Sequence, residues 1–147
     1  PVPIEKLHAL GALPPMDLQT LDGKTITNAD LAGKVTILHF WGTHCPPCVA
    51  ETPALKAAYD STLAGDPRLT FITLANDQSH HDLERYVSGR GLTWPVIPST
   101  ETAVVFWQSI GIDESPATVI VDPQGQIQWA GLHIPSNLPE IVSHLAQ

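Results

Sequence analysis

The stretch that decides the fold is LHFWGTHCPPCVAETPAL, residues 38–55, which holds the only two cysteines of the chain, Cys45 and Cys48. The run leading into it, VTILHFW (35–41), is β-branched and aromatic, which is typical of a buried central strand. The segment CPPCVAETPALKAAYDSTLAG (45–65) predicts a helix. The C-x-x-C pair therefore lies where a buried strand meets a helix.

Three prolines shape this predicted helix. Pro46 and Pro47 occupy its first turn, where a missing N–H group costs little. Pro53 lies inside the helix and is expected to kink it.

The rest of the chain alternates between predicted strands and helices. In order, these are a hairpin around Asp22–Gly23, a turn or short helix opening at Asn28, a second buried strand (68–76), a helix (80–91), an extended piece (92–99), a helix (100–112), two strands about a turn (117–131) and a closing helix (137–147). This order predicts an α/β fold, with a mixed sheet and helices on both faces. Residues 1–15 are proline-rich and predict an arm or linker, so the domain is expected to cover residues 16–147.

Composition limits the possible partners. The 147 residues suit one domain with its own core, and a net charge of −8 argues against nucleic acid or an anionic membrane as the main partner. No apolar run approaches the ~20 residues of a membrane span, and the N-terminus lacks a signal-peptide pattern. A chain that begins at Pro1 without an initiator methionine suggests a processed or trimmed product, which is compatible with the loss of a leader or anchor.

A C-x-x-C at a helix N-terminus has a specific chemical meaning. The thiolate is the nucleophile in disulfide exchange, and the free N–H groups of a helix N-terminus stabilise it. Cys45 is expected to be the exposed attacker. Cys48, one turn further, is expected to be shielded and to resolve the mixed disulfide.

The two intervening prolines lack N–H groups, so the donors left for a Cys45 thiolate are those of Cys48 and Val49. A charged His44, directly before the nucleophile, would partly compensate for the missing donors. We therefore expect a moderately lowered pKa for Cys45.

Two other interpretations of the pair stay open. A structural disulfide would add little stability, because the loop it closes is very short. A zinc site would need four ligands, which His80 and His81 would have to complete, although adjacent side chains rarely point the same way. We expect neither a metal nor an organic cofactor.

The segment FWGTHCPPC (40–48) resembles the active-site segment of thioredoxin-fold proteins, and residues 17–41 resemble the lead-in of their TlpA/ResA-type branch. That branch contains periplasmic or membrane-anchored extracytoplasmic thiol–disulfide oxidoreductases of bacteria. The resemblance covers residues 16–147. It implies a thioredoxin-like α/β fold, in which helices flank a central mixed sheet on both faces and an N-terminal hairpin extends it.

The resemblance also implies roles for individual residues. Cys45 matches the nucleophile, Cys48 the resolving cysteine and Trp41 the tryptophan packed beside the active site. Pro53 matches the kink proline of the active-site helix.

A second matching segment is ESPATVIVDPQG (114–125), which places the family's cis-proline at Pro116. The backbone of Ser115 would then pair with an incoming substrate strand.

Three positions depart from the family pattern. His39 stands where thioredoxins bury the aspartate that accepts the proton of the resolving cysteine, so it is either a proton shuttle or a neutral histidine satisfied by one backbone bond. His44 replaces a common tryptophan and either tunes the nucleophile or has no role. In the segment where a ResA-type glutamate is expected, only Asp77 is available, either as a substitute or as a cap of the following helix.

The predicted function is thiol–disulfide exchange that reduces extracytoplasmic protein disulfides, as in cytochrome c maturation. The resemblance implies re-reduction by a membrane electron donor of the CcdA/DsbD type, and we expect a monomer.

Two alternative functions remain. A disulfide-donating oxidant would use the same residues, and a Sco-like copper protein would bind Cu(I) through the cysteines and His133, although Sco cysteines are separated by three residues. A peroxiredoxin is disfavoured because its nucleophile motif is absent around Cys45.

Overall fold

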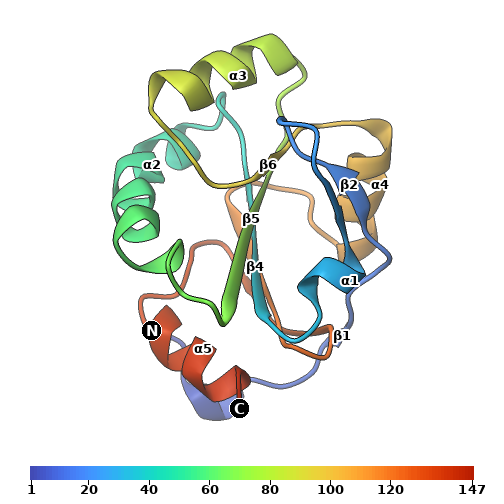
Figure 1. Ribbon diagram of the computed structural model, residues 1–147, viewed down its shortest axis with the longest axis vertical. Helices are drawn as coiled ribbons and strands as arrows, with labels where there is room; N and C mark the ends of the chain where they lie inside the picture. Colours follow the sequence, from blue (N-terminus) through green and yellow to red (C-terminus); the bar gives the residue numbers. More distant parts are fainter.

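The computed structural model describes residues 1–147 and contains a six-stranded sheet in the order β1-β8-β7-β4-β5-β6 (Figure 1). Its strands are β1 (Gly11–Ala12), β4 (Val35–Trp41), β5 (Leu69–Ala75), β6 (Val96–Ile97), β7 (Ala117–Val121) and β8 (Gln126–Gly131). β4 pairs in parallel with β5 and antiparallel with β7. The mixed sheet of the sequence prediction is confirmed.

The helices and the hairpin from residue 17 onward match the predicted order, whereas the short helix η1 lies in the segment predicted as an arm. The helices are η1 (Ile4–Lys6), α1 (Asn28–Leu31), α2 (Pro46–Ala58) with its continuation η2 (Tyr59–Leu63), α3 (His80–Gly89), α4 (Glu101–Ile110) and α5 (Leu138–Leu145). The hairpin pairs β2 (Asp17–Gln19) with β3 (Thr25–Thr27), and the turn between them contains Gly23 at φ 85°, a left-handed conformation that glycine adopts readily. None of the helices has the length and apolar character needed to cross a membrane.

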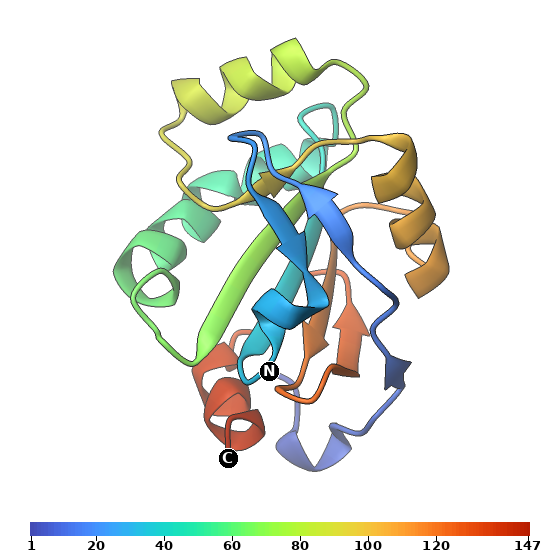
Figure 2. The same ribbon diagram turned by 45° about the vertical axis from the view of Figure 1, so that its right-hand side comes forward.

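All seven residues of β4 are buried, because a separate core covers each face of the sheet. Side chains alternate along a strand, so Ile37 and Trp41 enter the core shared with α2, α3 and α5. Leu38 and Phe40 enter the core shared with the hairpin, α1 and α4. Figure 2 shows the hairpin and α1 crossing one face of the sheet. Helices therefore cover both faces, as predicted.

The N-terminal residues pack against this domain. β1 pairs antiparallel with β8, and Asn137 at the start of α5 holds the backbone of Val2 through bonds of 2.9 and 2.7 Å. The boundary between an arm (1–15) and the domain (16–147) stays a prediction.

Ile37 tests the importance of β4 for stability. It is fully buried, so Ile37→Ala should lower the free energy of unfolding by about 2–5 kcal/mol through lost burial and an unfilled cavity. Val105→Ala, at an α4 position that is 61% exposed, is the control and should change it by less than about 1 kcal/mol. Urea denaturation measures both, and equal losses would contradict the assignment of β4 as the core strand.

Candidate redox site

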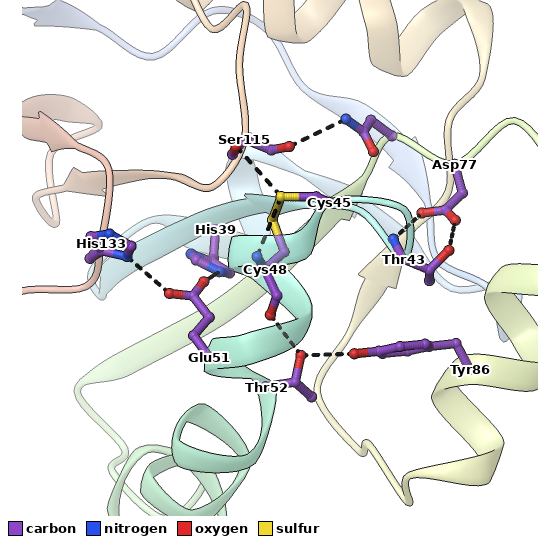
Figure 3. Close-up of a disulfide and its surroundings, with 11 residues drawn as sticks. His39, Thr43, Cys45, Cys48, Glu51, Thr52, Asp77, Tyr86, Ser115 and His133 are labelled. Atoms are coloured by element: carbon purple, nitrogen blue, oxygen red, sulfur yellow. Dashed lines mark hydrogen bonds and ion pairs between the residues drawn. A yellow bond between two sulfur atoms is a disulfide. The ribbon is translucent and has the colours of Figure 1, made fainter.

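Cys45 and Cys48 form a disulfide at the N-terminus of α2, just beyond the carboxyl end of β4 (Figure 3). Cys45 is the N-cap residue, and its sulfur accepts a hydrogen bond from the Cys48 backbone N–H at 3.3 Å. Cys45 is partly exposed, whereas Cys48 is only 1% exposed. The arrangement leaves one sulfur open to attack and shields the other.

A single backbone donor serves the Cys45 sulfur. Pro46 and Pro47 lie in the first turn of α2 and have no N–H group. The Val49 N–H bonds to the backbone oxygen of Cys45 at 3.0 Å, as the regular helix requires. The prediction that Val49 also donates to the sulfur is therefore wrong, since the helix uses that N–H.

The segment before β7 closes the site from the side. The Ser115–Pro116 peptide bond is cis, and the Ser115 carbonyl oxygen lies 3.6 Å from the Cys45 sulfur. Antiparallel pairing explains the contact, because it places Ala117, at the start of β7, opposite Phe40, near the end of β4. The backbone of Ser115 thus stands beside the disulfide, where the family resemblance placed it.

His39 lies beneath the site and is 1% exposed. Its Nδ1 is 3.1 Å from the Thr118 hydroxyl, which lies opposite it across β4 and β7. Its Nε2 is 2.9 Å from Oε1 of Glu51. Both contacts are to side chains, so the interpretation of His39 as a histidine satisfied by one backbone bond is wrong.

Glu51 is the site residue that the sequence reasoning missed. It follows Cys48 by three residues on α2, so the two side chains share one helix face. That spacing was the available signal. Oε2 of Glu51 lies 3.0 Å from Nδ1 of His133, which is exposed, so a contact chain joins buried His39 to the surface (Figure 3).

The Glu51 carboxyl is ionised more readily than an ordinary one. Burial raises its pKa, but the contacts with His39 and His133 outweigh burial and hold the pKa below its usual value. The contact between Oε1 and His39 has the distance of an ion pair but not the alignment of a hydrogen bond, so this buried oxygen lacks a donor.

Asp77 does not cap helix α3, and its role as a substitute for the ResA-type glutamate stays a prediction. It is 4% exposed, and it accepts hydrogen bonds from the backbone N–H, at 2.9 Å, and the hydroxyl of Thr43. The side-chain cap of α3 is instead Ser79, which accepts from the Asp82 N–H at 3.1 Å. The prediction of Asp77 as that cap is wrong, because its carboxylate fastens the loop that leads into Cys45.

Trp41 lies beside the site as expected. It is 3% exposed, and its ring packs 5.6 Å from that of Tyr86. The Tyr86 hydroxyl donates to Thr52, which in turn donates to the backbone oxygen of Cys48. This connection supports the first turns of α2 from the α3 side.

The remaining histidines do not form a metal site. His80 Nε2 lies 2.8 Å from the Ser99 carbonyl oxygen, and His133 contacts Glu51. No group of three His, Cys, Asp or Glu side chains is arranged to hold a metal ion. His44 is exposed and makes no hydrogen bond or ion pair, so its tuning of Cys45 stays a prediction.

Comparison with known proteins agrees with this site. The Redoxin family model matches residues 9–145, and the chain belongs to that family. It is 29% identical over 110 residues to the thiol–disulfide oxidoreductase ResA of Halalkalibacterium halodurans, covering 75% of this chain and 60% of the relative. It is 27% identical over 112 residues to sporulation thiol–disulfide oxidoreductase A of Bacillus subtilis, covering 76% and 66%. The chain thus spans somewhat less than two thirds of these relatives.

Solved structures show the same thioredoxin-like fold. A thiol:disulfide interchange protein from Chlorobium tepidum has a TM-score of 0.77 at 26% identity, with 95% of this chain and 98% of that chain covered. A thioredoxin-like protein from Neisseria meningitidis has a TM-score of 0.76 at 28% identity, with 92% and 89% covered. The thioredoxin-like fold prediction is confirmed.

The lowered pKa of Glu51 predicts a pH-dependent stability. Since folding lowers this pKa from 4.5, the carboxylate stabilises the fold above about pH 4.5, and this contribution is lost as the pH falls through the folded-state value. Glu51→Gln should therefore lower the free energy of unfolding at pH 7 and approach the parent protein as the pH falls below the folded-state pKa of Glu51. Denaturant titrations of the oxidised protein across this range measure the difference. Glu84→Gln, on the exposed surface of α3, is the control. A difference in free energy of unfolding between Glu51→Gln and the parent protein that does not change with pH would contradict the prediction.

Proposed function

We propose that this domain is a protein thiol–disulfide oxidoreductase that reduces disulfides of extracytoplasmic proteins. The observation that carries the proposal is the Cys45–Cys48 disulfide at the N-terminus of α2, with the backbone of Ser115 beside its exposed sulfur. Membership of the Redoxin family and the names of the relatives support it.

The reaction proceeds in two exchanges. The Cys45 thiolate attacks a substrate disulfide, forming a Cys45–substrate disulfide and releasing one substrate thiolate. The Cys48 thiolate then attacks the Cys45 sulfur, forming the Cys45–Cys48 disulfide and releasing the second substrate thiolate. Two electrons pass from the dithiol to the substrate. The Cys48 N–H stabilises the attacking thiolate, and Ser115 offers its backbone to an extended substrate segment.

The second exchange requires a proton acceptor, because Cys48 is buried and reacts only as a thiolate. Glu51 is the nearest carboxylate along α2, and its Oε1 has no hydrogen-bond donor in the oxidised protein. We assign the Cys48 proton to His39, whose Nε2 lies 2.9 Å from the ionised Glu51 carboxylate, which stabilises the imidazolium that forms. His133 then links this pair to solvent through the other carboxylate oxygen.

Thr118 allows His39 to change its charge without losing a partner. When the imidazole is neutral, the Thr118 hydroxyl donates to Nδ1. When the imidazole is charged, Nδ1–H donates to that hydroxyl, which turns to the Leu132 carbonyl oxygen at 3.4 Å. Both charge states of His39 therefore keep a partner at Nδ1, which suits a group that gains and loses a proton in each cycle.

The cellular setting is proposed from the family resemblance. We infer a position outside the cytoplasm and re-reduction by a membrane electron donor of the CcdA/DsbD type, with cytochrome c maturation as one pathway that would use such a reductant.

The direction of exchange depends on the reduction potential of the Cys45–Cys48 couple. A potential near about −270 mV supports a reductant, whereas one near about −120 mV would indicate a disulfide donor instead.

Substitution of each cysteine separates the two exchanges. Cys45→Ser should abolish insulin reduction by dithiothreitol above the uncatalysed rate, because the nucleophile is lost. Cys48→Ser should accumulate a Cys45–substrate disulfide, visible by mass spectrometry, because nothing resolves it. Turnover in Cys45→Ser equal to that of the parent protein would refute the proposed function.

The proton route predicts a defect confined to the second exchange. When the reduced protein reacts with Ellman's reagent, Cys45 releases the first thionitrobenzoate and Cys48 the second, so stopped-flow absorbance resolves both steps. His39→Asn should slow the second release about 100-fold at neutral pH, within the range of general acid–base catalysis, and leave the first within about twofold. His133→Asn should slow the second release less than His39→Asn does, and it should shift the pH profile of that release. His81→Asn, at an exposed histidine on α3, should change neither the rate of the second release nor its pH profile. Equal slowing of both releases in His39→Asn would indicate a structural defect and contradict the route.

A further inference from the structure

A cavity of about 280 Å³ is lined in part by Ser115, whose carbonyl oxygen lies 3.6 Å from the Cys45 sulfur, and it plays no part in the exchange described so far. It is bounded by the carboxyl ends of β4 and β5, by α4 and by the segment that leads to the cis peptide bond. Its apolar lining comes from Phe40, Trp41, Leu74, Val104, Trp107 and Ile112. Ser115 is part of the same lining, so the cavity adjoins the backbone that is proposed to receive the substrate strand.

The walls of the cavity are held by the fold. The ring of Trp107 packs edge-on against that of Phe40, with the centroids 6.1 Å apart, and Trp41 is almost completely buried. Helix α4 is fixed at its start by Thr100, whose side chain accepts from the Ala103 N–H at 3.1 Å. Six of the eleven lining residues are apolar, so this preformed cavity can take an apolar group without first having to rearrange.

One side of the cavity carries uncompensated negative charge. Asp113 and Glu114 line it, are exposed, and directly precede Ser115. Neither has a Lys, Arg or His within ion-pair distance. A cation next to the apolar group would therefore be attracted, and an anion repelled.

We propose that this cavity selects the substrate of the oxidoreductase: it takes a large apolar side chain from a polypeptide that carries Lys or Arg beside that residue. The proposal rests on the proposed function, because the substrate cysteine must reach Cys45, 3.6 Å from Ser115. Residues in an extended strand follow one another at about 3.3–3.4 Å, so the apolar residue lies within one or two positions of that cysteine. Shape complementarity thus supplies the apolar preference, and the two carboxylates supply the preference for a basic neighbour.

Synthetic peptides test the selection directly. Three disulfide-linked peptides differ only beside the cysteine, carrying Leu-Arg, Leu-Glu or Ser-Arg. We expect kcat/KM for the Leu-Arg peptide to exceed that of each of the others by about tenfold, the scale that loss of a few buried methylenes or reversal of a nearby charge produces. The advantage over Leu-Glu should shrink as the salt concentration rises.

Two pairs of variants locate the effect. Val104→Phe fills the cavity and should remove most of the preference for Leu over Ser, whereas Val105→Phe, at the next and exposed position of α4, should not. Asp113→Asn combined with Glu114→Gln should remove the preference for Arg over Glu. The matched control, Asp82→Asn combined with Glu84→Gln, changes two exposed acids of α3 and should leave that preference intact.

A small neutral disulfide, bis(2-hydroxyethyl) disulfide, separates this proposal from the proposed function, since it has no side chain to place in the cavity. The parent protein and the two control variants, Val105→Phe and Asp82→Asn combined with Glu84→Gln, should reduce it at the same rate. If the parent protein reduces neither this compound nor the peptides, the proposed function fails. If it reduces all of them but shows equal kcat/KM for the three peptides, or if Val105→Phe acts as Val104→Phe does, the cavity proposal is overturned and the exchange chemistry stands.

Discussion

The central position of β4 is the constraint on which the site depends. The strand is hydrogen-bonded on both sides and buried on both faces, so it cannot shift without breaking two ladders and two cores. Because β7 runs antiparallel to it, the beginning of β7 meets the end of β4. The same pairing therefore fixes Cys45 after one strand and Ser115 before the other, which brings the disulfide and the Ser115 backbone together.

The charged cluster below the disulfide follows from the same pairing. Register places Thr118 opposite His39, and α2 crosses that face of the sheet with Glu51 one turn beyond Cys48. A buried histidine and a half-buried carboxylate are each costly alone, and their contact offsets part of that cost. His133 is exposed, so it connects the cluster to solvent.

The local signals in the sequence were sufficient for the framework. The apolar run 35–41 identified the central strand, the Asp22–Gly23 turn identified the hairpin, and the paired prolines marked the start of α2. Each of these features is determined within a few residues of itself. The family resemblance added the identity of Pro116 and the side of the site on which Ser115 lies, which no local pattern contains.

Side-chain partners were less predictable because they depend on contacts between distant segments. His39 meets a hydroxyl 79 residues away, and Glu51 meets a histidine 82 residues away. Asp77 resembled an ordinary helix cap, since its contact with Thr43 forms only when β4 and β5 pair in parallel and end side by side. The sequence by itself determined the strand–helix junction, its two cysteines and the donors that proline removes, because these are local properties of the backbone. The tertiary structure alone decided which groups contact His39, which carboxylate fastens the loop before Cys45 and where the cavity next to Ser115 lies, because each is made by strands and helices that only the folded sheet brings into contact.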